Sequence, residues 1–268
     1  MRALRYLLPL LLTAAAPAPR CDEACLTTLA DRYMTALAAQ APGDVPWAAR
    51  VRFTENGVPM MIGDGLWGSM AGRPAKRAAS AADPASGQVA WFGRVDEHGQ
   101  PAFYAMRLKV TDGRIAEVET VIRRRQGNPP FGDAETFVLP AAPRQPLPAA
   151  RIEALADGYY AGIAAGDGTA LTRLAPACAA TVNGTAAACP ARLADRAIEA
   201  VRRRVALVDA AHGLALVAGE MDDPARDPAA YPRSLSFMAL VRVAADGIAR
   251  IDEIATEQPY LMPSPWKE

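Results

Sequence analysis

Leu29-Ala30-Asp31-Arg32-Tyr33 recurs 126 residues later as Leu155-Ala156-Asp157-Gly158-Tyr159. Further pairs follow in the same order: Asn56-Gly57 with Asn183-Gly184, Gly87 with Gly213, Gly93 with Gly219, Asp96 with Asp222, Val110 with Val243 and Ile115 with Ile248. Within each of the last two pairs the two residues are 133 positions apart, because the loop from Pro224 to Arg233 is longer than its counterpart in the first copy. An ordered series at a nearly constant offset predicts an internal duplication.

Each copy begins with one amphipathic helix. Its apolar residues are spaced by three and four positions, as one face of a helix requires. They are Leu26, Leu29, Ala30, Tyr33 and Leu37 in the first copy and Ile152, Leu155, Ala156, Tyr159 and Ile163 in the second. Asp22 and Pro148 precede the two helices and are typical of helix starts.

The remainder of each copy has strand character. Asn-Gly indicates a hairpin in each copy. We expect strands at about 88–95, 102–110 and 115–123 in the first copy, and at about 202–209, 213–221, 235–243 and 248–256 in the second. One helix followed by a curved antiparallel sheet is an α+β unit.

The chain divides into five segments on this interpretation. Residues 1–19 predict a signal peptide cleaved near residue 15, since two arginines, a short apolar run and small residues occur in that order. The first unit covers 20–125, a proline-rich linker covers 126–148, the second unit covers 149–260 and a tail covers 261–268. We therefore expect a periplasmic or secreted protein without a stable membrane anchor, because the apolar run is too short to span a bilayer.

Four cysteines in an exported chain predict disulfides. Cys178 and Cys189 flank the second Asn-Gly turn, so we expect them to be bonded to each other. Cys21 and Cys25 would then form the other pair, although their spacing at a helix start is less favourable and their pairing stays open. The spacings match no standard zinc-ligand pattern, and we expect no metal and no cofactor.

The composition excludes a basic nucleic-acid binder. Lys and Arg total 29, Asp and Glu also total 29, and 51% of the residues are hydrophobic.

Several segments resemble known families. The helix-then-sheet plan of both copies resembles the NTF2-like superfamily, which includes SnoaL-like proteins. The first copy also resembles a secreted, functionally uncharacterised family of bacteria and fungi, through 53–57 (Phe-Thr-Glu-Asn-Gly), 63–67 (Gly-Asp-Gly-Leu-Trp), 107–110 and 115–120. These resemblances imply tandem cone-shaped α+β units and assign no reaction, because this fold hosts unrelated functions.

Two carboxylates are candidate acid–base groups. If the four-residue turn 111–114 joins directly paired strands, Glu119 faces Met106 on a largely apolar face that also includes Tyr104. Burial would raise its pKa toward neutrality, as acid–base catalysis requires. Glu55 lies beside the first Asn-Gly turn, near the mouth of the cone. The alternatives are that the face of Glu119 is partly solvated and its glutamates pair with Arg94 or Arg123, and that Glu55 is an exposed turn residue.

The first copy holds three of the four tryptophans. We expect one ligand pocket there, between the 26–37 helix and the concave sheet. Its expected lining is Tyr33, Trp67, Trp91, Tyr104 and Met106. Large aromatic side chains serve as core filler or as walls of an apolar pocket.

Three functions remain open at this point. The first is binding of a small hydrophobic molecule in the cone of the first unit. The second is a cofactor-free isomerase, dehydratase or cyclase-type lyase that uses a buried carboxylate. The third is a structural or interaction domain with filled cones. In each case we expect no nucleic acid partner, and we expect the two units to pair within one monomeric chain as an intramolecular pseudo-dimer.

Overall fold

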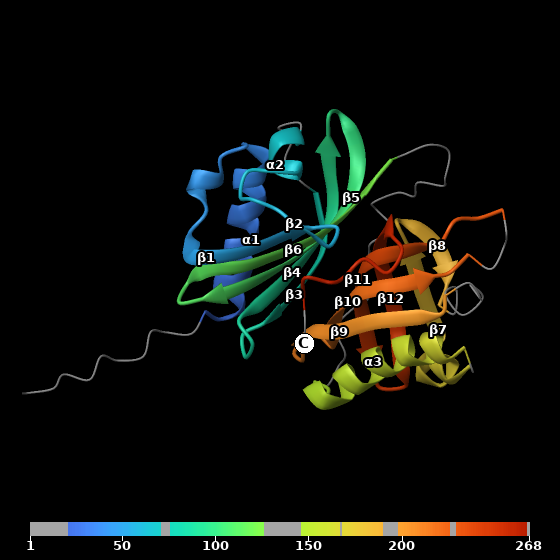
Figure 1. Ribbon diagram of the computed structural model, residues 1–268. Helices are drawn as coiled ribbons and strands as arrows, with labels where there is room; N and C mark the ends of the chain where they lie inside the picture. The colour runs from blue at the N-terminus through green and yellow to red at the C-terminus, as the bar shows by residue number, and fades with distance from the viewer. Residues whose placement is uncertain are drawn as a thin grey trace, which may run out of the picture.

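The computed structural model describes residues 21–70, 76–125, 146–166, 168–189, 198–225 and 229–266. The expected signal peptide and most of the expected linker lie outside the described residues. The chain folds into two successive units, and in each unit a long helix covers one face of a six-stranded sheet (Figure 1).

The first unit starts with α1, whose first turn is capped by the Asp22 side chain accepting a hydrogen bond from the Cys25 amide at 2.9 Å. Its elements are α1 (Glu23–Ala38), η1 (Pro42–Asp44), β1 (Trp47–Glu55), β2 (Val58–Pro59), α2 (Leu66–Ser69), β3 (Lys76–Asp83), β4 (Gln88–Glu97), β5 (Gln100–Thr111) and β6 (Arg114–Arg124). The strand order is β2-β1-β6-β5-β4-β3, with β1 parallel to β6 and all other neighbours antiparallel.

The second unit repeats this plan. Its elements are α3 (Ala149–Ala165), η3 (Thr169–Arg173), β7 (Leu174–Val182), β8 (Thr185–Ala188), β9 (Ala200–Asp209), β10 (Leu214–Asp223), β11 (Arg233–Ala244) and β12 (Gly247–Pro259). The strand order β8-β7-β12-β11-β10-β9 is equivalent to that of the first unit, and β7 is likewise parallel to β12. The protein is thus α+β, with two tandem NTF2-like units.

All seven expected strands are present, and most extend one to three residues beyond an expected end. Both Asn-Gly pairs have positive φ at both residues, as the tight β1–β2 and β7–β8 hairpins require. The sequence patterns did not indicate β3 or the full length of β1 and β7.

The two sheets pack against each other through the faces that point away from their helices. One hydrophobic cluster combines Phe92, Phe103 and Val121 of the first unit with Leu216 and Met238 of the second. Hydrogen bonds also cross this interface, from the Ala82 amide to Asp209 at 3.1 Å and from Gln88 to the carbonyl of Ala206 at 2.6 Å. That the protein is a monomer in solution stays a prediction.

A β-bulge sets which side chains of β6 face the helix. Val110 pairs with Ile115, but Lys109 pairs with Glu117, so Ala116 is an extra residue in β6. The expected direct pairing of Met106 with Glu119 is therefore wrong, because the bulge shifts the register by one residue and reverses the faces of the following side chains. The second unit has the same bulge, since Val243 pairs with Ile248 and Arg242 with Arg250.

The predicted Cys178–Cys189 disulfide is confirmed, and the second pairing, which the sequence left open, is also present. Cys178 is bonded to Cys189 across the β7–β8 hairpin, with a Cα–Cα distance of 5.7 Å. Cys21 is bonded to Cys25 at the start of α1, with a Cα–Cα distance of 5.3 Å.

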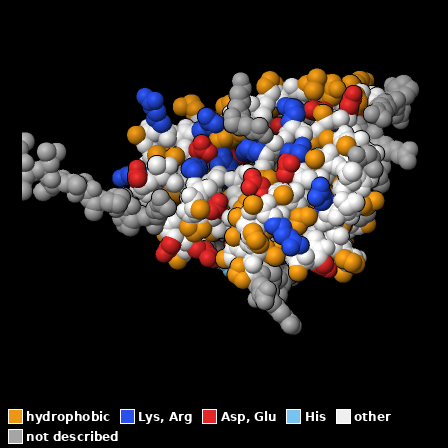
Figure 2. All heavy atoms as spheres, turned by 90° about the horizontal axis from the view of Figure 1, so that it is seen from below, with side chains coloured by type: hydrophobic (Ala, Val, Ile, Leu, Met, Phe, Trp, Pro, Cys, Tyr) orange, Lys and Arg blue, Asp and Glu red, His pale blue; other side chains and the backbone are white. Residues whose placement is uncertain are grey.

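The described helices include none with the length and apolarity needed to span a bilayer. Acidic and basic side chains are interspersed over the face seen in Figure 2, with hydrophobic side chains between them. This pattern agrees with the zero net charge of the chain.

Candidate functional site

The concave face of the first unit gathers the five side chains that the sequence predicted as a ligand pocket. Tyr33 comes from α1, Trp67 from α2, Trp91 from β4, and Tyr104 and Met106 from β5. All five are buried in one cluster. The ring centroids lie 5.3 Å apart for Tyr33 and Trp67, and 6.0 Å apart for Trp91 and Tyr104, both in edge-to-face geometry.

Among the residues that the structure describes, none accepts a hydrogen bond from the indole N–H of Trp67. The side chain is only 2% exposed, so this donor is shielded from bulk solvent. The N–H is near enough to the Tyr33 hydroxyl to influence its pKa, but the two are not in hydrogen-bonding geometry. A buried donor without an acceptor is costly, and ligand sites are one place where such a cost is tolerated.

The Tyr33 hydroxyl lies close to this donor, and the Tyr104 hydroxyl lies close to that of Tyr33. Burial raises the pKa of Tyr33 and also that of Tyr104, so both remain protonated near neutral pH. The neighbouring Thr120 hydroxyl donates to the carbonyl of Thr54 at 3.0 Å. The interior of the first cone therefore combines apolar walls with a few neutral polar groups.

Glu55 is buried at the edge of this cluster and is held by two partners. Its carboxylate accepts hydrogen bonds from the Leu66 amide at 2.9 Å and from Arg124 at 2.7 Å. Gly65 has a positive φ, and a Cβ there would lie 2.6 Å from the Glu55 carboxylate. The chain bends around this glutamate and fixes its position.

Arg124 extends this arrangement into a four-residue polar network. It also donates to Glu97, whose other hydrogen bond comes from the Ser69 hydroxyl at 2.5 Å. Burial raises the pKa of Glu97, but the bonds from Arg124 and Ser69 outweigh it and leave the pKa below its ordinary value. No sequence motif indicated Arg124, although alternation along β6 places it on the same face as Ile122.

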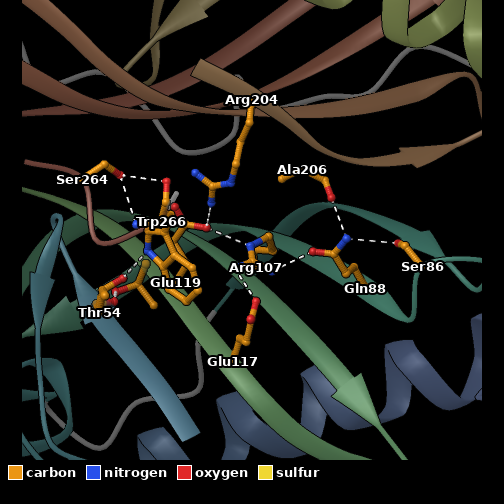
Figure 3. A network of polar contacts seen from close by, with 11 residues as sticks. Thr54, Ser86, Gln88, Arg107, Glu117, Glu119, Arg204, Ala206, Ser264 and Trp266 are labelled. Carbon is orange, nitrogen blue, oxygen red and sulfur yellow. Dashed lines mark hydrogen bonds and ion pairs between the residues drawn. The ribbon is translucent and has the colours of Figure 1, made fainter. Parts of the chain in front are cut away.

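Glu119 lies on the opposite face of the sheet from the aromatic cluster. It is 7% exposed and forms ion pairs with Arg107 at 2.8 Å and with Arg204 of the second unit (Figure 3). Arg107 also contacts Glu117 at 2.9 Å. The structure therefore places Glu119 in the interface between the units, away from Tyr104 and Met106, because of the bulge at Ala116.

The second cone has a different polar content. Glu253 is 2% exposed and accepts a hydrogen bond from the Tyr160 hydroxyl at 3.2 Å, while the Tyr160 ring stacks on Phe237. Its neighbour Asp252 is the counterpart of Glu119. It likewise lies on the face of the sheet that points away from the helix, where it pairs with Arg250 at 2.7 Å.

Across the described ranges, no three or more His, Cys, Asp or Glu side chains are grouped so that they could hold a metal ion.

Comparison with known proteins supports a duplicated chain. Residues 19–122 and 145–255 match one family model, described as Domain of unknown function (DUF8021). A comparison with curated proteins finds no match.

Several solved structures are similar to parts of the chain. AclR of Streptomyces galilaeus, a proposed hydroxylase, is 10% identical, with 42% of this chain and 83% of that chain covered and a TM-score of 0.35. A proposed ketosteroid isomerase of Kribbella flavida is 16% identical, with coverages of 40% and 84% and a TM-score of 0.33. A cystatin-like-fold protein of unknown function from Methylobium petroleophilum is 17% identical, with coverages of 46% and 99% and a TM-score of 0.34.

Proposed function

The chain belongs to the DUF8021 family, which assigns no activity, and from the geometry of the first cone we propose that it binds a small, largely apolar molecule carrying one hydrogen-bond acceptor. The observation that carries this proposal is the buried N–H of Trp67 within the aromatic cluster, for which no described residue supplies an acceptor. A carbonyl or ether oxygen of a ligand would satisfy this donor, while the rings of Tyr33 and Trp67 contact the apolar part of the ligand. We place this activity in the periplasm or outside the cell.

Binding is favoured over acid–base catalysis by the state of the two candidate carboxylates. Both oxygens of Glu55 are engaged, one by the Leu66 amide and one by Arg124. Glu119 is engaged by two arginines on the other side of the sheet. A general base must reach the proton that it removes, and neither carboxylate is free to do so in this arrangement.

The test uses a matched pair of probes, acetophenone with a carbonyl acceptor and ethylbenzene without one. We expect acetophenone to bind more tightly, and we expect Trp67→Phe to weaken acetophenone binding about tenfold, which corresponds to about 1.4 kcal/mol for one hydrogen bond. Ethylbenzene binding should change little in the same variant. Titration calorimetry and saturation-transfer NMR measure both.

Trp47→Phe is the matched control, since the Trp47 indole donates to the carbonyl of Pro42 at 2.8 Å. The ring of Trp47 packs edge-to-face against Tyr33 and Trp67, but its N–H is already paired, so this variant should leave the ratio of the affinities for acetophenone and ethylbenzene unchanged. Equal binding of the two probes to the wild-type protein, or no effect of Trp67→Phe, would contradict the proposal. If the two probes bind as expected, native mass spectrometry of the protein purified from its own cells would identify the natural ligand.

A further inference from the structure

The segment that follows β12 returns from the second unit to the first. Trp266 is buried between the two sheets, and its indole N–H donates to the Thr54 hydroxyl of β1 at 2.9 Å. Three guanidinium groups face its ring, those of Arg52, Arg107 and Arg204, at 4.9, 4.7 and 5.7 Å from the centroid. Figure 3 shows Arg204 reaching from the second unit toward Glu119 and Trp266.

A pocket of about 200 Å³ lies beside this ring. Arg202, Arg204, Ala218 and Glu220 of the second sheet form one side, and Ser264 and Trp266 of the returning segment form the other. None of these groups belongs to the aromatic cone of the first unit. The pocket is smaller than the usual site for a drug-sized ligand and suits a molecule with a single ring.

The charges around the pocket leave donors available for an anion. Arg202 is engaged by Asp222 through two bonds, at 2.9 and 2.8 Å. Arg204 uses one terminal nitrogen on Glu119 and makes no other hydrogen bond within the part of the chain that the structure describes. Its remaining N–H groups can therefore receive a carboxylate, which matches the planar fork of a guanidinium.

Two further groups favour a negatively charged ligand. Arg52 forms no ion pair with any described residue and adds positive charge at the outer side of the Trp266 ring. Burial raises the pKa of Glu220, and hydrogen bonding to Ser264 together with the nearby Arg202 and Arg204 only partly offsets this, while Glu119 raises it further. The raised pKa of Glu220 weakens its tendency to carry a negative charge beside a bound anion.

We propose that this pocket between the second sheet and the returning segment is a binding site for a small aromatic carboxylate, with its carboxylate on Arg204 and its ring against Trp266. The site is independent of the ligand site proposed in the first cone. Benzoate is the probe, and benzamide is its neutral counterpart of the same shape.

We expect calorimetric titration of the full chain to show benzoate binding at least tenfold more tightly than benzamide. Arg204→Lys should weaken benzoate binding at least tenfold, because lysine keeps the charge but loses the planar donors. Glu220→Gln should not weaken benzoate binding, because it removes a carboxylate beside the pocket and keeps a side chain of the same shape that can donate a hydrogen bond. Arg94→Lys is the control, as Arg94 pairs with Asp96 in the first unit and does not line this pocket.

A second measurement locates the ligand even where a variant folds poorly. In a nitrogen-15 spectrum of the wild-type protein, benzoate should shift the indole N–H signal of Trp266 and leave that of Trp67 unchanged. Trp67→Phe should likewise leave benzoate binding intact, which separates this site from the cone. Equal affinities for benzoate and benzamide, an unaffected Arg204→Lys variant, or a shift at Trp67 alone would each overturn the proposal.

Discussion

Replacing Glu119 by glutamine removes a buried negative charge that two arginines share. At 2.8 Å and an effective dielectric constant of about 20, the attraction between Glu119 and Arg107 is about 6 kcal/mol before the cost of desolvation is subtracted. Removing one partner of such a pair leaves the other charge buried and typically costs about 3–5 kcal/mol. We therefore expect Glu119→Gln to lower the free energy of unfolding by about 3 kcal/mol or more.

Glu117→Gln provides the matched control, because Glu117 pairs with the same Arg107 but has a side chain that is 32% exposed. Solvent-exposed ion pairs contribute about 1 kcal/mol or less, so this variant should lose much less unfolding free energy than Glu119→Gln. Urea denaturation followed by circular dichroism measures both free energies. A catalytic base would behave in the opposite way, with stability unchanged and activity lost. A loss below about 1 kcal/mol for Glu119→Gln would refute the assignment of Glu119 to the interface between the units.

Three further outcomes can be measured. Trp266→Ala should cost about 3–5 kcal/mol of unfolding free energy in the same urea assay, because a buried indole is lost, and a cost near zero would mean that the returning segment does not hold the units together. Replacing Cys178 and Cys189 by serine should cost about 2–3 kcal/mol, because the short loop is no longer closed in the unfolded chain, and an unchanged melting temperature would contradict this. Burial raises the pKa of Asp222, but hydrogen bonds from Arg202 and Ser234 outweigh it and leave the pKa below its ordinary value. The ionised Asp222 therefore stabilises the fold above about pH 4, and this contribution is lost as the pH falls through the folded pKa. Asp222→Asn should therefore flatten the fall in melting temperature between about pH 5 and 3, and parallel curves for the two proteins would argue against it.

The duplication was visible in the sequence because turns and helix faces have local signatures. The Asn-Gly pairs require positive φ values, and the spacing of Leu26 and Tyr33 requires a helical face, so both features recur at a constant offset. The Cys178–Cys189 disulfide was also predictable, because the hairpin between the two cysteines is local. The clustering of Tyr33 with Tyr104 followed from the face of one helix and the alternation along one strand, whereas Trp67 was expected there because three of the four tryptophans lie in the first copy.

The position of Glu119 depended on the tertiary structure. A single extra residue, Ala116, reverses the faces of all later side chains in β6, and nothing in its side chain distinguishes it from a regularly paired alanine. The pocket beside Trp266 depended on tertiary structure for a different reason. Its donors come from β9, while Trp266 contacts Thr54, which lies 212 residues away in the sequence. Local patterns therefore determined the helices, turns and two cones, whereas the register shift and the packing of the two sheets decided which charged side chains meet.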